Sequence, residues 1–268
     1  MKQADLGQPI ARGGVSELYA WPDGRVLKLF NRGFGARFAA DEARITARLH
    51  ALGLRVPAVG EPLEVEGRFG FPMQRLDGRI LAESAVADPT SAASAARTAA
   101  ELHAAMHALT DATLPAARTR FQRIIESSKE LEPALLKQVL DALHELPEHD
   151  QVCHGDFHAG NILVTATGPF VIDCATAHRG NPRVDAAQTC VAMTEWLAFP
   201  MPEPAHAALR VFIERYEKEY FALRPEGREE FERAKPVVAA VRLALPHPAT
   251  SDETLRRIVQ GRAASAAS

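Results

Sequence analysis

Residues 153–164 read CHGDFHAGNILV, and residues 170–173 read FVID. Together they form the pattern H-G-D-x-x-x-x-N, three apolar residues, a turn and a second apolar run that ends in aspartate. Asp156 supplies a carboxylate that can accept a proton from a hydroxyl group. Asn161 and Asp173 supply an amide oxygen and a carboxylate, the oxygen ligands that Mg²⁺ takes when it also holds substrate phosphates. A base and two metal ligands are the minimum set for phosphoryl transfer to a hydroxyl.

A hairpin turn rich in asparagine and aspartate would also explain His-Gly-Asp taken by itself. The chemical interpretation rests on the offsets of the other two groups. Asn161 comes directly before one apolar run, and Asp173 ends the next. The motif is therefore a hypothesis that its structural context must confirm.

This segment resembles the catalytic loop of the aminoglycoside phosphotransferase and choline kinase superfamily, which comprises small-molecule kinases with a protein-kinase-like fold. Protein kinases use H-R-D-x-x-x-x-N and D-F-G in the same roles, whereas this chain has H-G-D and I-D-C. In the superfamily, tryptophan often follows the second aspartate and proline often follows the second histidine. This chain has Cys174 and Ala159 at those positions. Neither departure replaces a catalytic group, and the resemblance extends over residues 8–200.

The resemblance implies an α+β, two-lobe, protein-kinase-like fold. A small β-rich N-terminal lobe of residues 1–77, hinge included, would bind the nucleotide. A larger helical lobe of residues 78–268 would carry catalysis and bind the acceptor. It further implies Asp156 as the catalytic base, Asn161 and Asp173 as Mg²⁺ ligands, and ATP or GTP as the phosphoryl donor.

The first strands surround two candidate glycines. Residues 8–30 predict a β-hairpin, because P-D-G at residues 22–24 separates two apolar runs. Gly13 and Gly14 would let backbone N–H groups approach a polyphosphate closely, although a plain turn explains them equally well. No G-K-[ST] follows, so this is not a P-loop. The stretch resembles the degenerate glycine-rich loop of the small-molecule kinases.

Lys28 interrupts the apolar run of residues 26–30. Alternation along a strand favours an outward, solvated lysine at this position. The resemblance instead implies the lysine that contacts the α- and β-phosphates of the nucleotide. Residues 36–52 have a helical apolar pattern, and Glu42 is the candidate that would orient Lys28, as in protein kinases. Asp41 is the alternative partner, and a solvated helix charge is the plainer interpretation of Glu42.

The segment after the N-terminal strands resembles the hinge of a kinase. Residues 58–66 and 68–74 alternate as two strands would. In the hinge of the resembled family, backbone groups bind the adenine ring, which implies a nucleotide contact around Gln74 and Leu76. Side-chain identity is a poor guide at such a position, because the backbone does the binding.

The second lobe is predicted to be mostly helical. The stretch ELHAAMH at residues 101–107 resembles the family's L-x-x-L-H helix. His107 matches the family's histidine in a structural, hydrogen-bonding role, whereas His103 is interpreted as an ordinary helix residue. Asp185 resembles the family's later aspartate at a helix start, where a carboxylate can receive loop amides.

Composition excludes several other classes. The formal net charge is −3 and no run of lysine or arginine occurs, which gives no sign of nucleic-acid binding. No apolar stretch approaches the length of a membrane span, so the chain is expected to be cytoplasmic. The three cysteines have no CxxC spacing, which argues against a disulfide framework or a zinc site.

The sequence therefore predicts a Mg²⁺-dependent phosphotransferase that moves the γ-phosphate of ATP or GTP to a hydroxyl of a small molecule. A catalytically silent, pseudokinase-like module that binds a nucleotide or metabolite is the alternative. The complete set of Lys28, Asp156, Asn161 and Asp173 argues against it. A protein kinase is disfavoured, because H-R-D, D-F-G and A-P-E are missing and the segment before Asp185 is too short for an activation loop.

The acceptor and the oligomeric state are not fixed by the sequence. An acidic pocket on the last helices would suit a cationic acceptor such as an aminoglycoside or choline. The candidate pocket residues are Glu195, Trp196, Glu214 and Glu217. Residues 214–219 mix both charge signs, which is more typical of an exposed helix.

Overall fold

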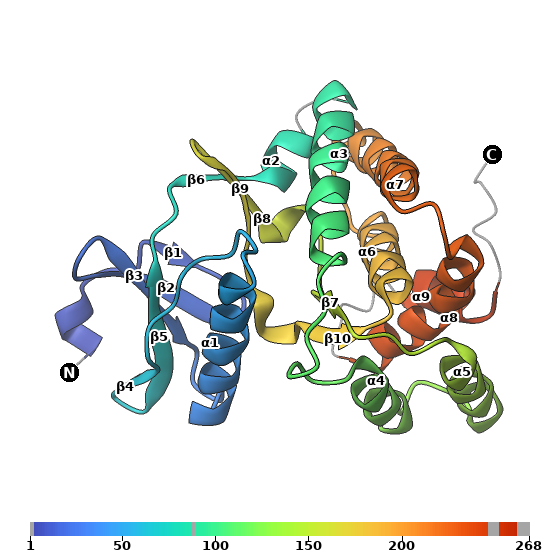
Figure 1. Ribbon diagram of the computed structural model, residues 1–268, viewed down its shortest axis with the longest axis horizontal. Coiled ribbons are helices and arrows are strands. Elements are labelled where there is room, and N and C mark those ends of the chain that lie inside the picture. Colours follow the sequence, from blue (N-terminus) through green and yellow to red (C-terminus); the bar gives the residue numbers. More distant parts are fainter. Residues whose placement is uncertain (1–2, 87–88, 246–251, 262–268) are drawn as a thin grey trace. The chain divides into compact units, whose positions relative to one another are not determined.

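An antiparallel five-stranded sheet with one helix beside it forms the N-terminal part of the computed structural model (Figure 1). The structure describes residues 3–86, 89–245 and 252–261. The strand order is β1-β2-β3-β5-β4. The elements are a 3₁₀ turn η1 (Gln3–Leu6), β1 (Ala11–Arg12), β2 (Ser16–Trp21), β3 (Arg25–Phe30), α1 (Ala36–Ala51), β4 (Leu63–Val65) and β5 (Arg68–Gln74).

The predicted hairpin is confirmed as β2 paired with β3. Asp23 and Gly24 adopt the left-handed region, with φ of 60° and 68°, which the tight turn requires. Strand β3 lies in the middle of the sheet, and apolar clusters cover both of its faces. One apolar cluster contains Leu27 and Leu29, and another contains Phe30 with residues of α1 and β5. Residues 26–30 are consequently all buried.

By its contacts the chain divides into two units, residues 1–79 with 163–176, and residues 80–162 with 177–268. The sequence analysis placed residues 163–176 in the second lobe. Arg55 explains their grouping with the first unit, because its guanidinium donates to the carbonyl oxygens of Thr167 and Pro169 at 2.7 and 3.0 Å. Its own carbonyl accepts from the N–H of Val171. Three short strands have the order β6-β8-β9, namely β6 (Gly78–Ile80), β8 (Ile162–Thr165) and β9 (Gly168–Val171).

Helices make up most of the second unit. Helix α3 packs along α7, and α6 packs along α8 (Figure 1). Strands β7 (Gln151–Cys153) and β10 (His178–Gly180) form a two-stranded antiparallel pair. The helices are α2 (Leu81–Ala85), α3 (Pro89–Met106), α4 (Ala117–Glu126), α5 (Pro133–Glu145), α6 (Pro182–Trp196), α7 (Glu203–Leu223), α8 (Arg228–Ala244) and α9 (Asp252–Val259).

The predicted α+β class, with a β-rich N-terminal region and a helical C-terminal region, is confirmed. The strand expected at residues 58–66 is shorter than predicted, since only Leu63–Val65 pairs continuously. Within the described ranges, no helix combines the length and hydrophobicity needed to cross a membrane. All three cysteines are buried and free, as expected, and burial raises the pKa of the thiol of Cys153.

Candidate functional site

Lys28 is buried at the centre of the first unit and bonded to two carboxylates. Its Nζ donates to Oε1 of Glu42 on α1 at 2.5 Å and to Oδ1 of Asp173 at 2.9 Å. Burial alone would lower the pKa of Lys28, but the charges of Glu42 and Asp173 outweigh burial and raise it. The lysine is therefore a fixed cation facing inward. Asp41, the alternative partner, lies on the outer side of α1, where it contacts Arg37 and Arg44.

Asp173 combines an unusual backbone with a half-exposed carboxylate. It has a φ of 62°, in the left-handed region, which costs a non-glycine residue about 1–2 kcal/mol. Such conformations persist where the surroundings determine them, and they cluster at functional sites. The following 3₁₀ turn η3 (Cys174–Thr176) packs against α1. One carboxylate oxygen contacts Lys28, and the side chain is 45% exposed, so the group can meet both the lysine and a ligand.

The loop between β7 and β8 holds Asp156 and Asn161 within the second unit. Gly155 has a φ of 78°, which turns the chain at the aspartate. The Asn161 amide nitrogen donates to the Asp156 carbonyl at 3.0 Å. The amide oxygen of Asn161 is thereby oriented as an acceptor, as a metal ligand requires. Asn161 ends a short 3₁₀ turn, η2 (Ala159–Asn161), in which the side chain of His158 caps the N–H of Gly160.

His158 is aligned with the carboxylate of Asp156. The N–H of Gly160 donates to His158 Nδ1 at 3.1 Å, so the ring proton lies on Nε2. That nitrogen is 3.7 Å from Oδ2 of Asp156. The ring also meets Trp196 edge to face at 4.8 Å between centroids. Burial would raise the pKa of Asp156, but the hydrogen bond and charge of His158, followed by the charges of His154 and Arg242, outweigh burial and lower it. Asp156 is therefore ionised at neutral pH.

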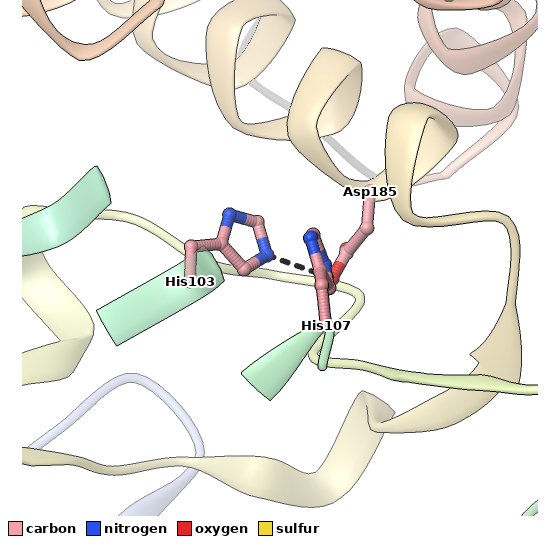
Figure 2. A group of neighbouring side chains, drawn as sticks. All are labelled: His103, His107 and Asp185. Carbon is pink, nitrogen blue, oxygen red and sulfur yellow. Dashed lines mark hydrogen bonds and ion pairs between the residues drawn. The ribbon is translucent and has the colours of Figure 1, made fainter. Parts of the chain in front are cut away.

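Buried His103 in α3 and buried His107, directly after the end of that helix, point at Asp185 of α6 (Figure 2). The Nε2 atoms of His103 and His107 lie 2.9 and 3.2 Å from Oδ2 of Asp185. The same carboxylate accepts the N–H groups of His154 and Gly155 at 2.6 and 2.9 Å. Asp185 thus fixes the two residues that precede Asp156, in the loop-binding role expected of it.

This cluster has the composition of a metal site, but its hydrogen bonds are complete without an ion. His103 Nδ1 is 2.6 Å from the hydroxyl of Tyr216, and His107 Nδ1 is 2.8 Å from that of Tyr220. If each tyrosine donates to Nδ1, each Nε2 carries a proton toward Asp185; the Tyr220 hydroxyl has the Pro182 carbonyl, at 3.3 Å, as a longer second acceptor. Burial, followed by the nearby His103, lowers the pKa of His107 to about 3, so the imidazole is neutral. We assign the cluster as a buried hydrogen-bonded anchor for the loop that carries Asp156.

His103 is the main residue that the sequence interpretation underrated. It is fully buried, and its ring stacks on Phe157 of the loop at 4.0 Å between centroids. Its partner Tyr216 lies more than a hundred residues later, so helical periodicity alone could not reveal the contact. Arg183 is a second buried polar residue of this unit that the sequence pattern does not reveal. It is buried and donates to the carbonyl of Glu226 at 2.7 Å.

The remaining predicted nucleotide contacts lie in the first unit. Gly13 and Gly14 connect β1 with β2, and a Cβ added to Gly14 would meet nothing within 4 Å. The fold itself therefore does not require glycine at position 14. Gln74 ends β5, and its backbone N–H donates to the carbonyl of Ala58 at 2.7 Å. Leu76 follows in the connection to β6 and is half-buried.

The model of a phosphotransferase enzyme family matches residues 9–231, which is most of the chain. The protein belongs to this family. The family assignment agrees with the resemblance carried by the H-G-D-x-x-x-x-N loop. No curated protein sequence matches the chain.

Solved structures place this phosphotransferase family member among protein-kinase-like folds. It is similar to an aminoglycoside-3'-phosphotransferase of type VIII, with 20% identity, a TM-score of 0.59, and coverage of 89% of this chain and 91% of the other. Aminoglycoside phosphotransferase APH(3'')-Id from Streptomyces rimosus has 17% identity and a TM-score of 0.62, over 89% and 95% of the two chains. A thermostable mutant of APH(4)-Ia has 18% identity and a TM-score of 0.57, over 95% and 87%. The predicted two-lobe, kinase-like fold class is confirmed.

Proposed function

We propose that this protein is a small-molecule kinase that transfers the γ-phosphate of ATP or GTP to a hydroxyl group in a Mg²⁺-dependent reaction. Membership of the phosphotransferase family supports the transfer of a phosphate group to a small molecule. The main observation in favour of a nucleotide and a metal ion is the buried Lys28. It is hydrogen-bonded to Glu42 on α1 and to Asp173, which follows the β8–β9 hairpin. A fixed cation beside a half-exposed carboxylate suits a nucleotide phosphate with its metal ion.

Lys28 is proposed to bind the α- and β-phosphates, with Glu42 holding it in place. The backbone at Gly13 and Gly14 is proposed to approach the phosphates, and Gln74 and Leu76 to flank the adenine. ATP as donor is supported by a similar solved structure, a ternary complex of an APH(4)-Ia mutant with AMP-PNP and hygromycin B.

Asn161 and Asp173 are proposed to bind Mg²⁺. Their chemistry fits a hard cation, because one offers an amide oxygen and the other a carboxylate. The Asn161 amide nitrogen is already committed to a carbonyl, which leaves the oxygen for the metal. When bound, the ion would neutralise phosphate charge as the phosphoryl group moves.

Asp156 is proposed to orient the acceptor hydroxyl and receive its proton. Its pKa is lowered, so it is an ionised but weak base. A weak base is sufficient, because in a loose phosphoryl-transfer transition state little charge develops on the attacking oxygen. His158 positions the carboxylate, and the Asp185 anchor fixes the backbone before it.

The direct test is ADP or GDP release with Mg²⁺ against a panel of small hydroxyl compounds, aminoglycosides included. We expect release that depends on one acceptor and disappears in Asp156→Asn, while that variant still binds nucleotide. Nucleotide binding without release for any acceptor would favour the silent binding module. Release that persists in Asp156→Asn would refute the role of this residue as the base.

A further inference from the structure

Side chains bind the backbone polar groups of the turn formed by Gly155 and Asp156. The N–H of Gly155 donates to Oδ1 of Asp185 at 2.9 Å, and the N–H of Asp156 donates to Nδ1 of His154 at 3.3 Å. The carbonyl of Asp156 accepts from the side-chain amide of Asn161 at 3.0 Å. The fourth backbone group of this turn is the carbonyl of Gly155.

Gln188 of α6 supplies the donor for that fourth group. Its Nε2 donates to the carbonyl of Gly155. A carbonyl can only accept, so the amide of Gln188 has one possible orientation at this contact. Gln188 lies three residues after Asp185, and one turn of α6 therefore binds both polar groups of Gly155. Helix α6 thereby fixes the orientation of the peptide that leads into Asp156.

The oxygen of the same amide is not used by the fold. Gln188 is only 8% exposed, and its Oε1 is buried without a hydrogen-bond partner among the described residues. A buried acceptor without a partner destabilises a protein at least as much as one ordinary hydrogen bond stabilises it. The net contribution of Gln188 to stability is therefore small, whereas its contact with Gly155 lies one residue from the proposed base. Such a buried, half-satisfied polar group is expected at a functional position.

We propose that Gln188 is a positioning residue for phosphoryl transfer, which holds the Gly155–Asp156 peptide so that the carboxylate of Asp156 faces the acceptor hydroxyl. This inference rests on the proposed kinase function and adds a residue of α6 to those that determine its rate. Gln188 acts through the backbone of Gly155. Its contribution to the rate can still be large, because a misplacement of about 1 Å at a reacting group can lower the rate about a hundredfold.

The first variant is Gln188→Met, which keeps an unbranched side chain of similar length but has no N–H donor. Hydrogen–deuterium exchange of the full chain, measured by mass spectrometry, follows the amides of residues 153–161. Exchange in this loop should be at least about threefold faster than in the wild type, because the turn has lost one of its bonds. With the acceptor identified from the panel, kcat should fall about tenfold to a hundredfold while the KM of ATP is unchanged. The urea midpoint should stay close to that of the wild type, because the variant also removes the unpaired Oε1.

The second variant, Gln188→Glu, tests the donor itself. A carboxyl group donates to the carbonyl of Gly155 only when it is protonated, and its ionised form would repel that oxygen. Burial and the nearby carboxylate of Asp185 both raise the pKa of the introduced group. The ratio of the variant kcat to the wild-type kcat should therefore rise at least about threefold from pH 8 to pH 6. The same ratio for Gln188→Met should stay constant. Taking the ratio removes the titrations that the proteins share, including those of Asp156 and His158.

Thr194→Val is the matched control on the same helix. The hydroxyl of Thr194 donates to the carbonyl of Cys190 at 2.8 Å, which is a bond within α6. This variant therefore removes one side-chain hydrogen bond of α6 and leaves the bonds to Gly155 in place. It should keep both the wild-type kcat and the wild-type exchange of residues 153–161.

Three outcomes would overturn the inference. Wild-type exchange of the loop in Gln188→Met would show that Gln188 does not hold the turn, whatever the activity. Equal losses of kcat in Gln188→Glu and Gln188→Met at every pH would show that the donor does not matter. A joint loss of kcat and of most of the urea stability in Gln188→Met would assign the residue to folding. If the wild type phosphorylates no compound, the kinase proposal fails instead, and faster loop exchange in Gln188→Met would still establish that Gln188 holds the turn.

Discussion

Acidification should destabilise this protein through His107, and the size of the effect follows from its burial. The imidazole has a pKa of 6.5 in the unfolded chain and about 3 in the folded one. Between these values the unfolded state binds the extra proton, so the stability that this group contributes falls as the pH decreases. Each pH unit below 6.5 removes about 1.4 kcal/mol. From pH 7 to pH 5 the loss is about 2 kcal/mol.

The assay is urea unfolding at a series of pH values between 5 and 7 for the wild type and His107→Gln. Glutamine places an amide nitrogen near the position of Nε2, so it can still donate to Asp185, but it does not titrate. Between pH 7 and pH 5, the free energy of unfolding should fall by about 2 kcal/mol more in the wild type than in His107→Gln. Asp185 does not interfere, because its pKa is lowered from 3.8 and its protonation lies at more acidic pH.

The control variant is His144→Gln, which removes an exposed imidazole on α5 and should follow the wild type at every pH. The assignment of a neutral, buried His107 would be refuted if the wild type and His107→Gln lost nearly the same free energy of unfolding between pH 7 and pH 5, with a difference below about 0.5 kcal/mol.

Four further substitutions test other parts of the structure. Glu42→Gln removes the charge that holds Lys28, so kcat/KM for the nucleotide should fall at least about tenfold; unchanged kinetics would separate Glu42 from nucleotide binding. Tyr216→Phe leaves Nδ1 of a buried histidine without its 2.6 Å partner, and urea unfolding should show a loss of about 1–3 kcal/mol. Gly70→Ala places a Cβ 2.1 Å from a carbonyl of β3 and should cost about 1–3 kcal/mol. Gly14→Ala, with open space around it, should stay within about 0.5 kcal/mol of the wild type.

The sequence could place Asp156 and Asn161 in one loop because that information is local. Asp156 and Asn161 lie five residues apart in one loop, and Asp173 ends the next hairpin, so spacing alone placed them. The fold class followed from the same segment. Glu42 could be chosen over Asp41 only through the family resemblance, and the structure shows its carboxylate against Lys28.

Other features depend on contacts between distant segments. The alternation of apolar and polar residues suggested that Lys28 points outward. Both faces of the central strand β3 are covered, so alternation along it does not distinguish buried from exposed side chains. The role of His103 depends on Tyr216 of α7.

The most direct test of the central claim is to follow the phosphorus balance by ³¹P NMR with Mg²⁺, ATP and the acceptor identified from the panel of hydroxyl compounds. The account predicts one phosphorylated acceptor for each ADP formed by the wild type, and neither product with Asp156→Asn. ADP accompanied only by inorganic phosphate, or equal transfer by Asp156→Asn, would contradict a small-molecule kinase with Asp156 as its base.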